Sequence, residues 1–337
     1  MKEVFAKLMV GGLLVGILAA CASNGLDEGT SGEAGDARET IAVFTKNQTN
    51  PFFETVRTGA ENAAAQMNAD VVHYIPTRPD SIPEQMSQIE DIIISRPDAI
   101  VFTPVDSQAM VPGILMLNVA DIPIINITDP IAGGDVVSFM GCDEFTLALN
   151  TARYLFERLN GSGDVIILEG VGGSVNSTNR VGGYMTALED FPNITLLASQ
   201  PGNFQRLQAL QVMENLIQTY PRIDGVLAAN DSMALGAIEA LDGANRTALV
   251  VGLNGTKEAV DAIKAGTLLA TGDCDGFKHG CMGTMAAVRH LRNLPVPAEF
   301  NFAVAVIDDT NYGSLDLPVE QRVCPAWESV EGIVDGE

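Results

Sequence analysis

The chain has 337 residues, a length that favours about two domains. Hydrophobic residues make up 47% of it, which excludes an intrinsically disordered chain. Its 43 acidic residues against 19 Lys and Arg give a net charge of −24, and this excess argues against nucleic-acid binding, because phosphates need basic partners.

The first element is a targeting segment. An apolar stretch from Leu8 to Ala20 follows a short basic region, and it is too short to span a membrane but suits a signal-peptide core. It runs into the letters LAAC, which resemble a bacterial lipobox ending at Cys21. The alternative is a plain secretory signal with an incidental cysteine. We predict a signal peptide over 1–20, lipidation at Cys21, and a flexible tether over 21–39 that anchors the protein to a membrane, in the periplasm or on the cell surface.

A regular alternation of strand and helix begins at Ile41. The first series comprises strands 41–45, 71–75, 99–103, 122–127 and 136–140, and helices 51–67, 83–95 and 109–120. The second comprises helices 145–159, 179–190, 207–220, 232–241, 257–265 and 278–291, and strands 165–168, 194–198, 225–229, 249–252, 268–271 and 302–307. Such βαβ units predict an α/β protein with two doubly wound parallel-sheet lobes and ligands at the carboxyl ends of the strands. The tail over 319–337 is irregular.

Motifs for catalysis or metal binding are missing from the sequence. It has no GxxxxGK[ST], GxSxG or HExxH motif, and the run from Gly170 fails as a dinucleotide fingerprint because its sixth position is Val175. Besides Cys21 there are four cysteines, which allow three pairings, and no CxxC pair that would favour zinc. We therefore expect no catalytic residue, no cofactor and no metal, and a protein that is not an enzyme.

The loop after the first strand carries the clearest ligand chemistry. Asn50 precedes Pro51, Phe52 and Phe53 at the carboxyl end of a strand. Aromatic rings beside amide side chains suit a sugar or polyol, because C–H faces stack on rings while hydroxyls need polar partners. A helix-core role fits one of the two phenylalanines equally well.

Nine collinear stretches resemble the ribose-binding-protein-like group of periplasmic binding proteins, the substrate-capturing components of sugar ABC transporters. They are 50–53, 98–110, 120–125, 136–144, 179–184, 198–206, 228–237, 250–256 and 268–275. The resemblance implies two lobes joined by three crossover strands, near Cys142, Cys274 and Ala303, that close on the ligand. It implies an N-terminal lobe of 40–142 plus 275–303 and a C-terminal lobe of 143–274 plus 304–318.

The resemblance also implies ligand contacts. Asn50 and the phenylalanines match the family's first loop, Arg180 its arginine that forks onto sugar hydroxyls, and Phe204 its second-lobe aromatic. Asn230 matches the family's amide at a strand end, although helix capping is an alternative or additional role for it.

Departures from the family pattern mark the remaining candidates. Thr128 and Asp129 replace an Asp-Arg pair of ribose binders, Asn254 replaces an Asp, Cys274 replaces a hinge Gln, and Lys46 replaces a small polar residue. We therefore doubt ribose as the ligand. The hypothesis is that Lys46 donates to a ligand oxygen, of an anionic group or a hydrated ketone.

Cys142 and Cys274 would both lie on crossings, as part of the site. Two interpretations stay open for them: a disulfide, or two buried thiols that fill small hinge positions.

The sequence therefore predicts a lipid-anchored monomer that captures a small sugar-like ligand for ABC permease subunits. An alternative is a sensor, for example of an autoinducer-2-like sugar, that docks on a chemoreceptor or receptor kinase. A repressor core of this fold would need a basic helix-turn-helix where the chain has a signal peptide and an acidic tether.

Overall fold

Two six-stranded sheets form the framework of the structure, a computed structural model that describes residues 38–330, 332 and 333. The first has the strand order β11-β5-β4-β3-β1-β2 and the second β12-β10-β9-β8-β6-β7. The strands of the first sheet are β1 Thr40–Phe44, β2 Asp70–Tyr74, β3 Ala99–Phe102, β4 Ile124–Ile127, β5 Ser138–Cys142 and β11 Glu299–Phe302. Those of the second are β6 Ser162–Glu169, β7 Asn193–Pro201, β8 Gly225–Ala228, β9 Leu249–Leu253, β10 Ala270–Asp273 and β12 Ala305–Ile307.

Apolar residues fill both faces of the central strands. In β1, Ile41 and Val43 belong to one buried cluster, whereas Ala42 and Phe44 belong to another on the opposite face. Strand pairs are parallel except for β10 with β12. Parallel strands covered on both faces are the reason for these continuous apolar runs, and the predicted α/β fold class is confirmed.

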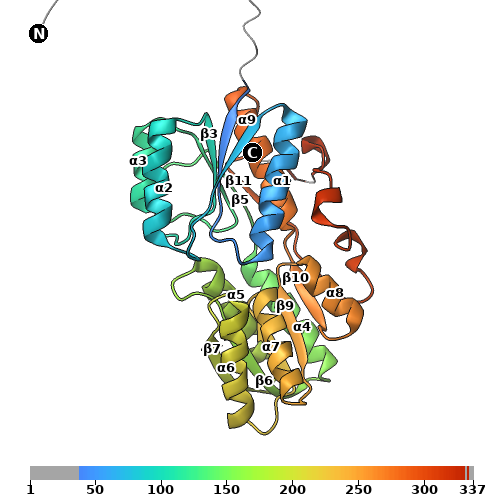
Figure 1. Cartoon of the computed structure of the whole chain (residues 1–337). Coiled ribbons are helices and arrows are strands. Elements are labelled where there is room, and N and C mark those ends of the chain that lie inside the picture. Colours follow the sequence, from blue (N-terminus) through green and yellow to red (C-terminus); the bar gives the residue numbers. More distant parts are fainter. Residues whose placement is uncertain (1–37, 331, 334–337) are drawn as a thin grey trace, which may run out of the picture. The chain divides into compact units, whose positions relative to one another are not determined.

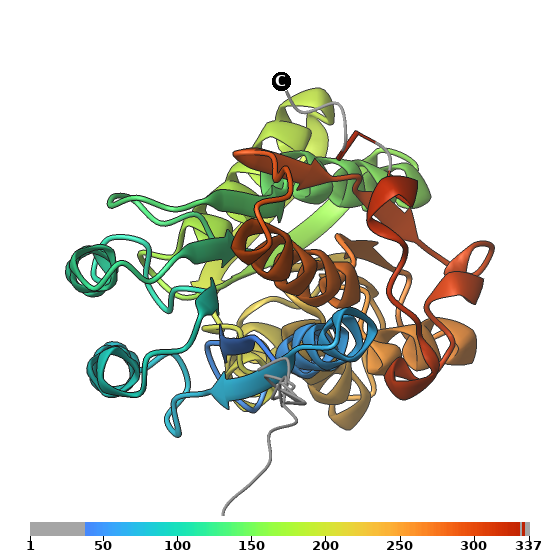
Figure 2. The same cartoon turned by 90° about the horizontal axis from the view of Figure 1, so that it is seen from above.

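Helices cover both faces of each sheet. Beside the first sheet lie α1 Pro51–Met67, α2 Ile82–Ser95, α3 Val111–Val119 and α9 Gly276–Leu291. Beside the second lie α4 Glu144–Arg158, α5 Val175–Asp190, α6 Arg206–Thr219, α7 Asp231–Gly243 and α8 Lys257–Ala265. Figure 2 shows α2 and α3 on one side of the first sheet and α1 with α9 on the other. Helix α5 begins four residues before its predicted start, because the Ser174 hydroxyl caps it by accepting from the Ser177 amide.

Within the described residues, the chain passes between the two sheets three times. We call the first sheet with its helices the N-terminal lobe and the second with its helices the C-terminal lobe (Figure 1). The passages lie between β5 and α4, between β10 and α9, and between β11 and β12. The predicted strand 302–307 is wrong as one element, because the chain changes sheets at Ala303–Val304 and its halves join different lobes.

Two disulfides join distant parts of the described chain. Cys142 bonds to Cys274, so of the two interpretations of this pair the structure shows the disulfide. Cys281 of α9 bonds to Cys324 of the tail. The tail carries short 3-10 helices at Tyr312–Ser314, Val319–Gln321 and Trp327–Ser329.

The predicted signal peptide, Cys21 and the tether up to residue 37 lie outside the described residues. Within 38–330, 332 and 333, no helix combines the length and the apolar character that crossing a bilayer requires.

Candidate ligand-binding site

A cavity of about 440 Å³ opens at the carboxyl ends of strands from both lobes. The N-terminal lobe lines it with Lys46, Asn47, Asn50, Phe52, Phe53, Asp80, Thr128 and Asp129. The C-terminal lobe lines it with Glu144, Asn176, Arg180, Phe204 and Asn254. Charged, amide and aromatic side chains of both lobes therefore line one cavity, the polar and apolar mixture typical of small-molecule sites.

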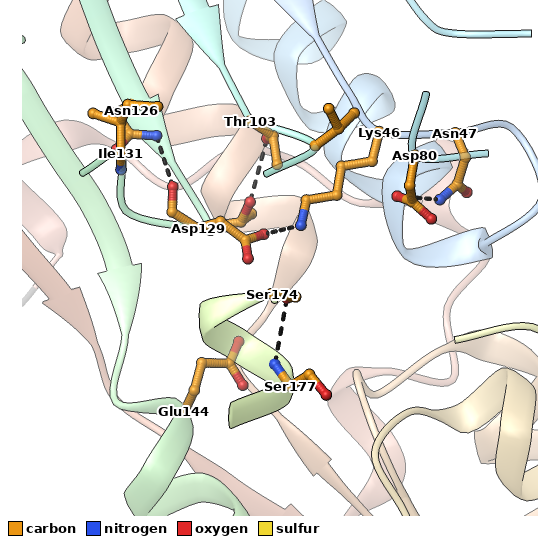
Figure 3. A network of polar contacts seen from close by, with 12 residues as sticks. Lys46, Asn47, Asp80, Thr103, Asn126, Asp129, Ile131, Glu144, Ser174 and Ser177 are labelled. Carbon is orange, nitrogen blue, oxygen red and sulfur yellow. Dashed lines mark hydrogen bonds and ion pairs between the residues drawn. The ribbon is translucent and has the colours of Figure 1, made fainter. Parts of the chain in front are cut away.

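An ion pair forms part of the N-terminal wall. Lys46 Nζ lies 2.7 Å from Asp129 Oδ2, and the two side chains are only 8% and 4% exposed (Figure 3). The loop of Asp129 is held by Asn126, whose side-chain amide donates to the Asp129 carbonyl at 2.9 Å. Thr128 donates to the Thr103 hydroxyl at 3.3 Å. The charge of Lys46 is therefore already compensated within the protein.

A second ion pair forms part of the C-terminal wall. Arg180 donates from Nε and Nη2 to the two carboxylate oxygens of Glu144, at 2.6 and 2.9 Å, and from Nη1 to the Ala229 carbonyl at 2.6 Å. Both side chains are buried. One edge of the guanidinium holds Glu144, so the predicted contact of Arg180 with ligand hydroxyls stays a prediction for its remaining N–H groups. Two of the five N–H groups of an arginine remain beyond these three bonds.

Aromatic rings reach the cavity from both lobes. Phe52 and Phe53 stand edge to face, with centroids 5.4 Å apart, in the first turn of α1. Phe204 comes from the other lobe, with the Arg180 guanidinium 5.8 Å from its ring centre. Gly170 makes room for this ring, because a Cβ there would lie 2.1 Å from Phe204 Cζ. Gly170 begins the glycine-rich segment that fails as a dinucleotide fingerprint, and its contact with Phe204 explains why a glycine stands there.

Four residues of the cavity have left-handed backbones. Their φ angles are 56° at Asp80, 63° at Thr128, 58° at Phe204 and 125° at Asn254. Such angles are uncommon outside glycine and cost free energy, so they persist only where the surrounding structure holds them. Their concentration around one cavity indicates a functional site independently of any resemblance.

Sequence reasoning missed four lining residues, namely Asn47, Asp80, Glu144 and Asn176. Asn47 Nδ2 donates to Asp80 Oδ1 at 3.3 Å, and burial raises the pKa of the Asp80 carboxyl, an effect that neighbouring Lys46 opposes. Glu144 follows the helix cap Asp143, and acids at helix starts are common. In the sequence, Glu144 therefore looks like an ordinary acidic residue at a helix start, and nothing there marks it as part of the site.

Three predicted site residues lie elsewhere. Asn230 caps α7, accepting from the Met233 amide at 2.9 Å, and donates to the Phe204 carbonyl at 3.1 Å. The capping role weighed for it is thus present, and its contact with the cavity is indirect. Cys142 and Cys274 form their disulfide beside His279, whose Nε2 lies 3.6 Å from Cys274 Sγ. Bonded sulfurs offer no thiolate, so this cluster has lost the ligands that a metal would use.

Two α/β lobes that line one polar and aromatic cavity define a solute-binding protein, a class that captures small molecules. The chain belongs to the periplasmic binding protein family, whose periplasmic binding protein domain matches residues 41–294. This is a family of binding proteins, so the prediction that the chain is not an enzyme is confirmed.

Curated relatives and solved structures extend the match over most of the chain. The ribose import binding protein RbsB of Haemophilus influenzae is 31% identical over 81% of this chain and 92% of its own length. The xylitol-binding protein of Mycolicibacterium smegmatis is 27% identical over 95% of this chain and 92% of its own length. A periplasmic solute-binding protein of Actinobacillus succinogenes with bound D-allose has a TM-score of 0.78 and 31% identity, covering 82% of this chain and all of that one.

Proposed function

We propose that this protein is the extracytoplasmic substrate-binding protein of an ABC importer and that it captures a neutral sugar or polyol between its lobes. The observation that carries this proposal is the cavity, where rings from both lobes flank two internally paired cations and several amides. Rings bind the C–H faces of a sugar, and the amides and ions bind its hydroxyls. Relatives named for ribose and xylitol support the same ligand class.

Charge balance sets the ligand's charge. The cavity holds two cations, Lys46 and Arg180, and three carboxylates, Asp80, Asp129 and Glu144. When all are ionised, the net charge is −1, so an anionic ligand would be desolvated without a free cation to pair with. We therefore expect a neutral ligand at Lys46 rather than an anionic one.

Asp80 is the acceptor that we assign to a ligand hydroxyl. Its Oδ1 receives only the long bond from Asn47, and its Oδ2 accepts no hydrogen bond from any residue between 38 and 330. A carboxylate with this free capacity, facing a cavity, suits a hydroxyl donor. The Asp80→Asn variant should bind the sugar about tenfold or more weakly, since a hydrogen bond to a charged group contributes about 1.5–3 kcal/mol.

Asp121→Asn is the matched control for Asp80→Asn. Asp121 also has a left-handed backbone, with φ 55°, but it is exposed and lies outside the cavity. Its affinity should equal that of the unmodified protein. If the Asp80→Asn variant bound the sugar as tightly as the Asp121→Asn variant, Asp80 would not contact the ligand.

The lipid anchor and the transport role are part of the proposal. A lipidated Cys21 would keep the protein outside the cytoplasm near the permease subunits, as a monomer. Mass spectrometry of the N-terminal peptide tests the lipid, and co-purification with the permease tests the partner. Recovery of a chemoreceptor or receptor kinase in place of the permease would favour the sensor alternative.

A thermal-shift screen tests the ligand class directly. A ligand at 100 times its Kd stabilises by about 2.7 kcal/mol, which raises Tm by several degrees. We expect such a rise with at least one of D-ribose, D-allose, xylitol and related neutral sugars, and none with D-galacturonate or D-ribose 5-phosphate. No response to any neutral sugar or polyol would overturn the proposal, and a response to the anions would overturn the charge argument.

A further inference from the structure

The tail after β12 begins on the C-terminal lobe. Asp308 accepts a hydrogen bond from Tyr154 of α4 at 2.7 Å. Further along, both carboxylate oxygens of Asp316 lie 2.9 Å from Lys264 Nζ of α8, and Lys257 Nζ of the same helix lies 3.4 Å from Asp316. These contacts fix residues 308–316 to the C-terminal lobe.

The same tail ends on the N-terminal lobe. Cys324 is bonded to Cys281 of α9, and its amide donates to Asn62 Oδ1 of α1 at 2.9 Å. Trp327 packs under Arg289 of α9, whose guanidinium carbon is 4.6 Å from the ring centre. Both α1 and α9 cover the first sheet, so residues 324–327 are fixed to the N-terminal lobe. The attachment at Cys324 is covalent.

The part of the tail between these attachments stands away from the crossings. One open hollow is lined both by tail residues such as Leu317 and Gln321 and by the crossing residues Asp275 and Val304. Figure 1 shows this red segment running along one side from the level of α8 to that of α1. The tail therefore bridges the lobes at a distance from the three passages of the chain.

We propose that residues 308–327 form a strap, a fourth connection between the lobes that limits how far they open. The three passages lie near the axis about which the lobes turn, so they restrain the opening angle little. A strap away from that axis restrains it strongly, because lobe separation there grows with the angle. Fixed at Asp316 and Cys324, the strap reaches about 28 Å at full extension.

The two ends of the strap differ in strength. The Cys281–Cys324 bond is covalent, whereas Lys264 and Asp316 are 39% and 33% exposed, and exposed ion pairs contribute little. The C-terminal-lobe end is thus the one that releases. Once Asp316 is released, the chain from Asp308 to Cys324 reaches about 56 Å and no longer restrains the lobes. The strap is a latch that favours the conformation with both lobes on the ligand.

Ligand affinity follows from this preference. Affinity falls with the fraction of protein in the binding-competent conformation, so releasing the strap weakens binding without changing a single contact in the cavity. We expect a two- to fivefold higher Kd in the Asp316→Asn variant and in the Cys281→Ser/Cys324→Ser variant. Their combination should match the stronger of the two, because both release the same strap.

Pulsed electron resonance on the full mature chain tests the strap without needing a ligand. Spin labels go on Val119→Cys of the N-terminal lobe and Leu207→Cys of the C-terminal lobe, which are 86% and 65% exposed. We expect both release variants to broaden the distance distribution towards longer values, with Asp309→Asn, an exposed acid of the same tail without an ion pair to residues 38–330, as the unchanged control. A lower Tm with an unchanged distribution in both variants would overturn the strap and leave the tail a stabiliser of the N-terminal lobe. Because these distances are measured on the free protein, a failed sugar screen would not be mistaken for a failed strap.

Discussion

Glu144 offers the sharpest test of how the site is built. Its carboxylate holds Arg180 by two hydrogen bonds of 2.6 and 2.9 Å, and both side chains are buried. Removing one partner of a buried ion pair leaves an uncompensated charge, which costs about 3–5 kcal/mol. The Glu144→Gln variant keeps the shape and one acceptor, so we expect a loss near 3 kcal/mol.

Urea unfolding measures this loss. The midpoint should fall while the slope with denaturant stays constant, since the surface exposed on unfolding is unchanged. Ligand affinity should fall more than tenfold, because the two free N–H groups of Arg180 would lose their orientation in the cavity.

A double variant tests whether the loss comes from the charge left unpaired. The Glu144→Met/Arg180→Met variant removes both charges, and replacing a buried pair by apolar side chains is often neutral for stability. We expect it to be more stable than Glu144→Gln, although it should not bind sugar. A Glu144→Gln protein within 1 kcal/mol of the unmodified one, or a double variant no more stable than the single one, would refute the reasoning.

Three further predictions concern single residues. The Lys46→Met variant leaves Asp129 buried without its cation, so unfolding free energy should fall by about 3 kcal/mol or more in a urea titration; an unchanged value would mean that the 2.7 Å pair contributes nothing net. Burial lowers the pKa of His279 to about 4, so the unfolded chain binds its proton more readily and stability falls as pH drops from about 6.5 to 4, by up to about 3 kcal/mol. In the His279→Gln variant this part of the pH dependence should vanish from unfolding curves, and an identical profile would contradict the assignment. The Asn230→Ala variant removes the cap of α7 and should lower Tm in proportion to about 1 kcal/mol, whereas no change would show that the cap is dispensable.

Local signals in the sequence predicted the elements well. Helix α1 begins at Pro51 and ends at Met67, as its apolar periodicity predicts. The predicted start of α5 and the prediction of one strand over 302–307 were wrong. In both cases the deciding interaction was a cap or a change of sheet, neither of which alters the hydrophobic pattern.

The site itself was predictable only in part. Residues on the loops after strands, such as Lys46, Asn50 and Phe204, line the cavity because the carboxyl ends of parallel strands converge. The partner of each charge was not predictable: Arg180 was assigned to the ligand, whereas Glu144, 36 residues away in sequence, holds it. In a chain with 43 acidic residues, no spacing rule selects the one that pairs.

The sequence by itself determined the α/β class, the order of the elements, the family and the acidic character that argues against nucleic acid. These properties depend on periodicity, caps and composition, which are local or summed over the chain. Only the tertiary structure decided that Lys46 and Arg180 are paired within the protein, that Asp80 faces the cavity, and that Cys281 joins Cys324 across 43 residues to fasten the tail. Such pairings depend on which groups the fold brings within a few ångströms of each other, and neighbours in space leave no signature at a fixed distance along the chain.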